Sequence, residues 1–346
     1  MAIVLKRSMI GGGKVSRKRQ ERTTRESALR TSRLSCTEDG LATSVTMVGG
    51  RETRKINTYQ ALRDAYLSAV VFGVFRCTMG LGEDFALERV FNTPLTEQGI
   101  VGFGTGLAAT GHTAIAKIQF ADYILLAFDQ DPAKVRYCSG GQYNIGGLTV
   151  RTPTMSVVWT GGFYYSQSPE GFFMDAAGLN IVILRSLIKA KESLLSSIRD
   201  SNPVVFTEAK ILYRSACRYQ VPIDHFSLPL KHAETLIPGN DMTVLTWRNP
   251  AYHCEMAIHM LANPPPSIEQ HILSSLRSIK TELIDFRIIL PWNIVTVTES
   301  VSRTGRLVIV HEADWTLGVG TEISAQIQKR CFSKLDAPVW HVTSWE

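Results

Sequence analysis

The glycines between Gly99 and Gly106, in the sequence GIVGFGTG, are the residues that could form a phosphate-binding loop. A dinucleotide loop of the form G-x-G-x-x-G that began at Gly102 would need glycine at position 107, where the chain has leucine. No predicted strand runs directly into the first glycine, as such a loop requires. Small side chains also let another helix approach closely. The segment therefore predicts a closely packed helix rather than a nucleotide site.

Cysteine and histidine could bind a metal, but their spacing does not favour it. The six cysteines lie far apart with no C-x-x-C pair, which predicts reduced, buried thiols. His253 and His259 are six residues apart, whereas two ligands on one helical face need a spacing of four. We assign no metal site to them.

Short β-branched runs alternate with helical patterns from about residue 57 onward. The predicted strands are 69–72, 113–120, 180–184, 203–207, 242–246, 283–286 and 306–310. This alternation predicts an α/β fold with parallel sheets covered on both faces. Between the third and fourth of these strands, apolar residues recur at helical spacing: Leu187, Ile188, Leu194, Leu195 and Ile198. They predict a βαβ unit whose helix turns Lys189, Lys191 and Glu192 to water.

The length of 346 residues predicts two domains with separate cores, at about 150 residues per domain. The segment 218–239 holds three prolines and little periodicity, so we expect it to link a first domain, 56–217, to a second, 240–346. Pro264, Pro265 and Pro266 should end a helix inside the second domain, because proline lacks a backbone donor.

Basic residues are concentrated at the start of the chain. Residues 1–35 carry ten Lys or Arg and two Glu, which leaves a net charge of −2 on the rest. An Arg/Ser/Thr-rich, acid-poor segment is typical of a mitochondrial transit peptide, so we expect residues 1–50 to be a transit peptide and disordered leader. The alternative is a nucleic-acid arm. No aromatic residue interleaves these charges, so we expect no nucleic-acid partner. The longest apolar stretch, 67–75, is too short to span a membrane.

Five blocks of sequence together resemble one family. They are Val74-Phe-Arg-Cys-Thr-Met-Gly-Leu81, the block from Val90 to Gly104, Ile118-Gln-Phe-Ala-Asp-Tyr-Ile124, Ser166-Gln-Ser-Pro-Glu170 and Lys210-Ile-Leu-Tyr-Arg214. Over about residues 56–340 the chain is similar to beta subunits of thiamine diphosphate-dependent 2-oxo acid dehydrogenases, above all the mitochondrial branched-chain (3-methyl-2-oxobutanoate) enzyme. The resemblance implies two doubly wound α/β domains, a transketolase-like pyrimidine-binding domain and a transketolase C-terminal domain.

The resemblance also implies an activity and partners. The activity is that of 3-methyl-2-oxobutanoate dehydrogenase (2-methylpropanoyl-transferring), an oxidative decarboxylation with acyl transfer to a lipoyl carrier, in branched-chain amino acid catabolism in the mitochondrial matrix. The implied partners are two alpha subunits and a second beta chain in a heterotetramer, and a lipoyl-bearing acyltransferase core. The chain has neither the Gly-Asp-Gly motif nor the later Asn-Asn pair that hold the diphosphate through magnesium. We therefore expect the thiamine diphosphate site to be shared, with magnesium held by the alpha subunit.

The family pattern assigns site residues one by one. Gln119 and Tyr123 match a glutamine and a tyrosine that line the cofactor pocket; otherwise they would simply satisfy buried backbone groups. A potassium site built largely of carbonyl oxygens would map to Gly146, Leu148, Thr149, Ser197, Asp200 and Asn202. Without the resemblance, the turn after residue 199 reads only as the end of a helix.

Three departures from the family bear on activity. An acidic, glycine-rich insertion, whose glutamate hydrogen-bonds the aminopyrimidine, is missing between residues 73 and 74; Glu83 and Asp84 are expected to be solvated turn residues. Tyr165 stands at the position of a catalytic histidine, and a phenol exchanges protons at pH 7 less readily than an imidazole. The family also continues beyond about residue 342. Two alternatives stay open: an active beta subunit, or a catalytically impaired paralogue that is a non-catalytic assembly or regulatory partner.

Overall fold

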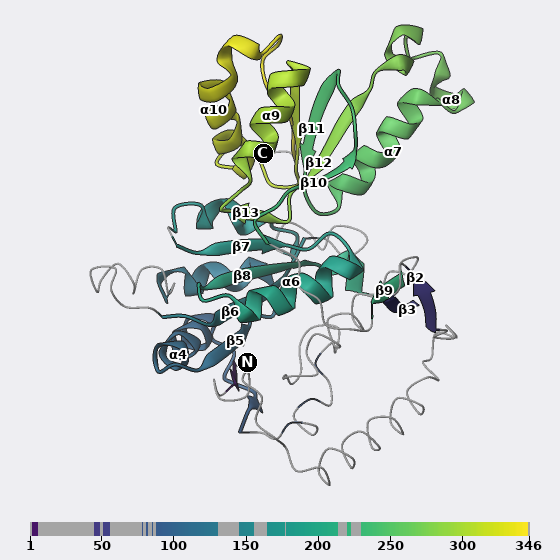
Figure 1. The fold of residues 1–346 in the computed structure, drawn as a ribbon. Helices are drawn as coiled ribbons and strands as arrows, with labels where there is room; N and C mark the ends of the chain where they lie inside the picture. Colours follow the sequence, from purple (N-terminus) through teal and green to yellow (C-terminus); the bar gives the residue numbers. More distant parts are fainter. Residues whose placement is uncertain are drawn as a thin grey trace.

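The structure is a computed structural model that describes residues 2–5, 45–48, 51–55, 78, 81, 85, 88–130, 145–155, 165–176, 178–213, 220–222 and 230–344. Two large sheets form two domains, drawn one above the other in Figure 1. The predicted strand 69–72, the junction at residues 73 and 74, Glu83 and Asp84 lie outside the described residues. Within the described part, no helix has both the length and the apolar character needed to cross a bilayer.

The first sheet has seven strands in the order β13-β7-β8-β6-β5-β1-β4. Its centre is parallel and consists of β5 (Thr113–Lys117), β6 (Leu148–Thr154), β7 (Asn180–Ile183) and β8 (Val204–Ala209). Every residue of these four strands is buried, as expected for parallel strands covered on both faces. Antiparallel strands form the edges: β13 (Ile288–Leu290) pairs with β7, and β1 (Ala2–Leu5) lies between β5 and β4 (Val90–Phe91).

The glycine-containing segment forms a helix, as predicted, namely α4 (Glu97–Ala109). Its glycines allow close packing, but not only against another helix. A Cβ atom on Gly104 would lie 3.0 Å from Leu148 of β6, and one on Gly102 would lie 3.0 Å from the side chain of Gln130. The helix thus sits directly on the sheet at one glycine and against the 3₁₀ helix η3 (Ala121–Gln130) at the other.

The predicted βαβ unit is confirmed, because helix α6 (Leu187–Arg199) joins the parallel strands β7 and β8. The prediction for its polar face is wrong: Lys189, Lys191 and Glu192 are 5%, 2% and 0% exposed. Residues from the second domain contact this helix at Lys189, which pairs with Asp285 (2.6 Å) and with Glu234. Charged residues on a helix face therefore mark an ionic contact here rather than a solvated surface.

The second sheet has five strands in the order β10-β12-β11-β14-β15. They are β10 (Glu234–Ile237), β11 (Met242–Thr246), β12 (Thr281–Asp285), β14 (Leu307–Val310) and β15 (Trp340–Val342). All pairs are parallel except β10 with β12. In Figure 1, α7 (Pro250–Ala262) lies on one side of this sheet and α9 (Ile294–Thr304) and α10 (Val319–Cys331) on the other. The three prolines separate α7 from the short α8 (Pro266–Glu269), as predicted.

Several segments depart from the predicted domain plan. β10 lies inside the predicted linker, and β9 (Gln220–Pro222) pairs with β3 (Arg51–Lys55) in a small sheet with β2 (Val45–Val48). The leader is not wholly disordered, because it contains β1, an apolar run paired with β5, and β2. β13 comes from the second half of the chain but extends the first sheet. The chain therefore crosses between the domains more often than a single linker implies.

Candidate functional site

Three aromatic side chains meet beyond the carboxyl end of β5. Phe120 follows this strand, Tyr123 lies in the first turn of η3, and Tyr165 comes from a distant segment. Their ring centroids are 5.4 Å apart for Phe120 and Tyr165, 5.8 Å for Phe120 and Tyr123, and 6.4 Å for Tyr123 and Tyr165. The half-buried Gln119 immediately precedes Phe120. The structure thus brings Tyr165 to the segment that holds Gln119 and Tyr123. This place lies at the carboxyl end of parallel strands, where ligands usually bind.

A buried ion pair lies next to these rings. Lys210 is the first residue after β8, and its Nζ lies 3.3 Å from Asp122 Oδ2 and 4.6 Å from the centroid of the Phe120 ring. The Lys210 Nζ also donates to the carbonyl oxygen of Tyr165 at 2.8 Å. Burial lowers the pKa of Lys210, although Asp122 opposes that effect. Three chain segments therefore converge on one ammonium group.

A second cluster of charged side chains is buried near the carboxyl end of the same sheet. Glu208, near the end of β8, bonds to Arg151 of β6 and to the hydroxyl of Tyr213, and Lys117 Nζ lies 3.6 Å from its carboxylate. All four residues are buried. Burial alone would raise the pKa of Glu208, but Arg151 and Lys117 hold it below its usual value. This cluster links the three parallel strands β5, β6 and β8.

The two segments of the predicted potassium site meet at the opposite end of the first sheet, through Thr149 and Ser197. Thr149 Oγ1 donates to the carbonyl oxygen of Ser197 at 3.3 Å, which links the start of β6 to the end of α6. Asp200 caps α6, and its carboxylate accepts from the backbone and side-chain nitrogens of Asn202 at 2.8 and 3.0 Å. Gly146 and Leu148 lie at the start of β6, where Leu148 N donates to Gly146 O at 2.7 Å. The arrangement gathers oxygen atoms at the negative end of a helix dipole.

A further polar cluster joins the two domains. Arg248 follows β11, and its guanidinium bonds to Glu170 (3.1 Å), Ser168 (2.6 Å) and Thr207 (2.7 Å) of the first domain. Trp247 stacks on His311 with 5.2 Å between ring centroids. Burial raises the intrinsic pKa of Glu170, but Arg248 lowers it below the usual value. The segment that carries Tyr165 is therefore attached to the second domain through Ser168 and Glu170.

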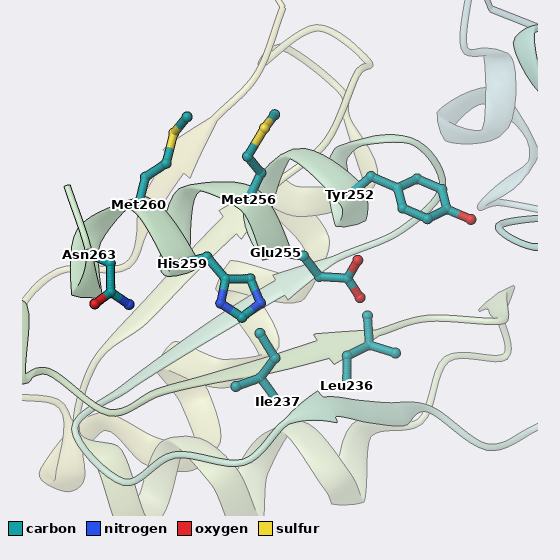
Figure 2. A pocket seen from close by; sticks show the side chains of 8 residues that line it. All are labelled: Leu236, Ile237, Tyr252, Glu255, Met256, His259, Met260 and Asn263. Atoms are coloured by element: carbon teal, nitrogen blue, oxygen red, sulfur yellow. The ribbon is translucent and has the colours of Figure 1, made fainter. Parts of the chain in front are cut away.

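An open groove of about 710 Å³ lies elsewhere, between α7 and β10. Figure 2 shows Glu255 and His259 pointing from α7 toward Leu236 and Ile237. Glu255 is engaged by Arg185, 3.3 Å away. The groove contains none of the site residues predicted from the sequence. Among the described residues, no group of three or more His, Cys, Asp or Glu is placed to hold a metal ion.

Comparisons with known proteins agree with this architecture. Residues 63–216 match the family model "Transketolase, pyrimidine binding domain" and residues 231–346 match "Transketolase, C-terminal domain". The chain is 46% identical to the mitochondrial 2-oxoisovalerate dehydrogenase subunit beta of Dictyostelium discoideum, over 85% of this chain and 80% of that protein. It is 51% identical to the mitochondrial subunit beta 2 of Arabidopsis thaliana, over 78% and 72%. The chain belongs to the family of 2-oxoisovalerate dehydrogenase beta subunits.

Membership of this beta-subunit family confirms the resemblance read from the sequence blocks. A solved structure described as "Split gene transketolase, inactive beta4 tetramer" aligns with a TM-score of 0.63 and 17% identity, covering 84% of this chain and 90% of that one. At this identity the likeness supports the fold alone. It agrees with the predicted pair of doubly wound α/β domains.

Sequence reasoning missed the charged residues that support the rings. Glu170 and Lys210 fell inside blocks that resemble the family, but no role was assigned to either. Arg248 carried no signal, because its partners Ser168, Glu170 and Thr207 lie at least 41 residues away in sequence. The signal that could have found Lys210 is its position directly after a buried strand, where a charged residue must find a partner.

Proposed function

We propose that this chain is the beta subunit of a branched-chain 2-oxo acid dehydrogenase that decarboxylates 2-oxo acids oxidatively and passes the acyl group to a lipoyl carrier. The observation that carries the proposal is its identity of 46% and 51% to relatives named 2-oxoisovalerate dehydrogenase subunit beta, over most of each chain. The reaction is that of 3-methyl-2-oxobutanoate dehydrogenase, because 2-oxoisovalerate and 3-methyl-2-oxobutanoate are the same acid.

The residues beyond β5 suit the pyrimidine end of thiamine diphosphate. Gln119 supplies an amide that both donates and accepts hydrogen bonds, and Tyr123 with Phe120 supplies flat apolar surface. When bound, thiamine diphosphate supplies the electron sink for decarboxylation. Tyr165, which is 41% exposed, would add ring surface and a hydroxyl hydrogen bond rather than rapid proton exchange. The chain's own residues would thus bind and orient one ring of the cofactor and shield it from water.

The remaining cofactor groups are assigned by chemistry. The sequence lacks the Gly-Asp-Gly motif, so we assign the diphosphate and its magnesium to the alpha subunit. The oxygen atoms of Thr149, Ser197 and Asp200 fit a hard cation, and the end of α6 adds carbonyl oxygens with partial negative charge. We assign potassium to this place, with Gly146, Leu148 and Asn202 completing the segment.

Partners and location follow from the same family. The relatives are named as beta subunits, which implies an alpha subunit, and those from eukaryotes are named mitochondrial. We extend this to a heterotetramer with a second beta chain, docked on a lipoyl-bearing acyltransferase core in the mitochondrial matrix.

Reconstitution with the alpha subunit of the same organism tests the proposal. The assay measures decarboxylation of 2-oxoisovalerate with an artificial electron acceptor, with and without thiamine diphosphate and magnesium. We expect turnover from the assembled complex and none from either subunit alone. Assembly without turnover would support an impaired paralogue instead, and failure to assemble would contradict the proposal.

One variant pair tests the assigned pocket. Gln119→Ala should raise the KM for thiamine diphosphate by about tenfold, because one hydrogen bond to the cofactor is lost. Gln326→Ala is the matched control, since Gln326 is half-buried on α10 and bonds only to Glu322 among the described contacts. An equal KM for thiamine diphosphate in both variants would contradict the assignment of Gln119 to the pocket.

A further inference from the structure

The Asp122–Lys210 pair is almost completely inaccessible, with each side chain 1% exposed. Its two groups belong to segments 88 residues apart, the start of η3 and the end of β8. Neither group can reach a substrate from this depth, so neither is suited to direct chemistry. They are suited instead to holding other parts of the chain in place.

Both members of the pair bind the backbone of one short segment. Lys210 Nζ donates to the carbonyl oxygen of Tyr165 at 2.8 Å, and the backbone N–H of Gln167 donates to Asp122 Oδ1 at 2.9 Å. The carboxylate thus uses one oxygen for the segment and the other for the ammonium, 3.3 Å away. The two neighbours of Ser166, Tyr165 and Gln167, are therefore both hydrogen-bonded to the same ion pair.

These attachments determine where the Tyr165 ring lies. Asp122 is the immediate neighbour of Tyr123, and Lys210 lies over the face of Phe120 at 4.6 Å. The ring of Tyr165 contacts both of these aromatic side chains, yet it is 41% exposed and gains little support from burial. The backbone bonds to the ion pair therefore contribute to its orientation, beside the bond from Met155 N–H to the carbonyl oxygen of Gln167 at 3.3 Å.

We propose that Asp122 and Lys210 are positioning residues that hold the segment 165–167, and with it Tyr165, against Tyr123 at the thiamine-binding site. The inference rests on the proposed function for the identity of the ligand. The attachment itself is a property of this chain and can be measured separately. Charge-assisted hydrogen bonds suit this role, because they are shorter and stronger than neutral ones.

Three variants separate positioning from general stability. Lys210→Met removes the donor to Tyr165 and leaves a buried carboxylate without its cation. Asp122→Asn keeps an acceptor for the Gln167 N–H and keeps the Lys210 donor to Tyr165, but it leaves the buried ammonium without its carboxylate. The double variant has no buried charge left at this place, but it still lacks the donor to Tyr165. Lys189→Met is the control, because it also breaks a buried ion pair, with Asp285, on α6 at the domain boundary.

Two measurements on the complex with the alpha subunit are compared: amide hydrogen exchange of the segment 165–174, and the steady-state kinetics. Lys210→Met should speed local exchange and raise the KM for thiamine diphosphate by about tenfold each. Asp122→Asn should change both by less than about threefold, since both backbone attachments persist. The double variant should recover melting temperature relative to Lys210→Met, because no unpaired charge stays buried, without recovering exchange or KM.

The outcomes decide between the roles. Recovery of melting temperature, exchange and KM together in the double variant would show a stabilising pair only and overturn the inference. Lys189→Met should lower the melting temperature without changing exchange at 165–174; the same local change in this control would also overturn it. If the unmodified complex is inactive while exchange responds as expected, the proposed function fails and the attachment stands.

Discussion

The carboxyl ends of the two parallel sheets carry similar charged residues but use them differently. In the first sheet, Lys117, Arg151 and Glu208 from β5, β6 and β8 bond to one another inside a single domain. In the second sheet, Arg248 after β11 instead bonds to Glu170 of the other domain. One sheet end is therefore a self-contained platform, and the other is a contact between domains.

The two ends also differ in the direction of the pKa shift of a buried carboxyl group, which is downward for Glu208 at the first end and upward for Glu312 at the second. His311, after β14, is 3% exposed and stacks on Trp247 at the domain contact. Burial lowers the pKa of His311 to about 4 and raises the pKa of its neighbour Glu312 to about 7. The comparison teaches that charges paired within a domain can support a fixed site, whereas this domain contact should respond to pH.

The largest expected effect is at the self-contained end. Glu208→Ala should lower the free energy of unfolding by about 3–5 kcal/mol, because it leaves two buried cations, Arg151 and Lys117, without their carboxylate. Denaturant unfolding of the purified complex measures this loss. Glu208→Gln, which keeps the shape but not the charge, serves as the comparison and should lose nearly as much.

Glu170→Ala at the domain contact should have a smaller effect, about 2–3 kcal/mol. It strands one cation, Arg248, which keeps Ser168 and Thr207 as neutral partners. The same unfolding experiment ranks the two variants. A larger loss for Glu170→Ala than for Glu208→Ala would break the comparison, because it would make the domain contact the main site of buried charge.

The fold was largely predictable because its signals are local. The run 242–246 coincides with β11, and the apolar spacing after residue 186 located α6. What failed depends on distant partners. Lys189 on α6 was predicted to be solvated because its partners Asp285 and Glu234 come from the second domain. Likewise β13 extends the first sheet although its sequence adjoins a strand of the second.

The candidate site was predictable only in part, and by resemblance rather than by pattern. Gln119, Tyr123 and Tyr165 were assigned from the family, and the structure brings their segments together. Lys210 and Asp122 could not be paired from the sequence, because nothing in a linear pattern indicates that residues 88 positions apart share an ion pair. Ionic partners that follow different strands of one sheet can be identified only when the strand order is known.

The pH response of the domain contact sharpens the comparison further. Because the pKa of Glu312 is raised from 4.5 to about 7 on folding, its protonated form is favoured in the native state. Stability from this group is present below pH 4.5 and is lost as the pH rises through 7. Glu312→Gln removes this titration. The free energy of unfolding of the variant, relative to that of the unmodified chain, should therefore rise by about 2 kcal/mol as the pH goes from 5 to 8.

Melting temperatures of both proteins across that pH range measure the difference. Glu322→Gln, an exposed residue on α10, is the control and should show the same pH profile as the unmodified chain. Parallel profiles for Glu312→Gln and the unmodified chain would mean that the domain contact does not titrate there.

The smallest expected effect lies at the amino end of the first sheet, where the comparison extends to a third kind of charged site. If oxygen atoms of Thr149, Ser197 and Asp200 bind potassium, the folded complex should gain about 1 kcal/mol in KCl over NaCl at equal ionic strength, by ligand linkage. Asp200→Asn should abolish that difference, because the negative charge is removed from the cation's surroundings.

Asp241→Asn is the matched control, because the carboxylate of Asp241 also accepts a backbone N–H, from Lys280 at 2.7 Å, but lies in the second domain. It should lower stability slightly and leave the potassium response unchanged. An equal response to both salts in the unmodified complex would make this end of the sheet a helix cap without a cation.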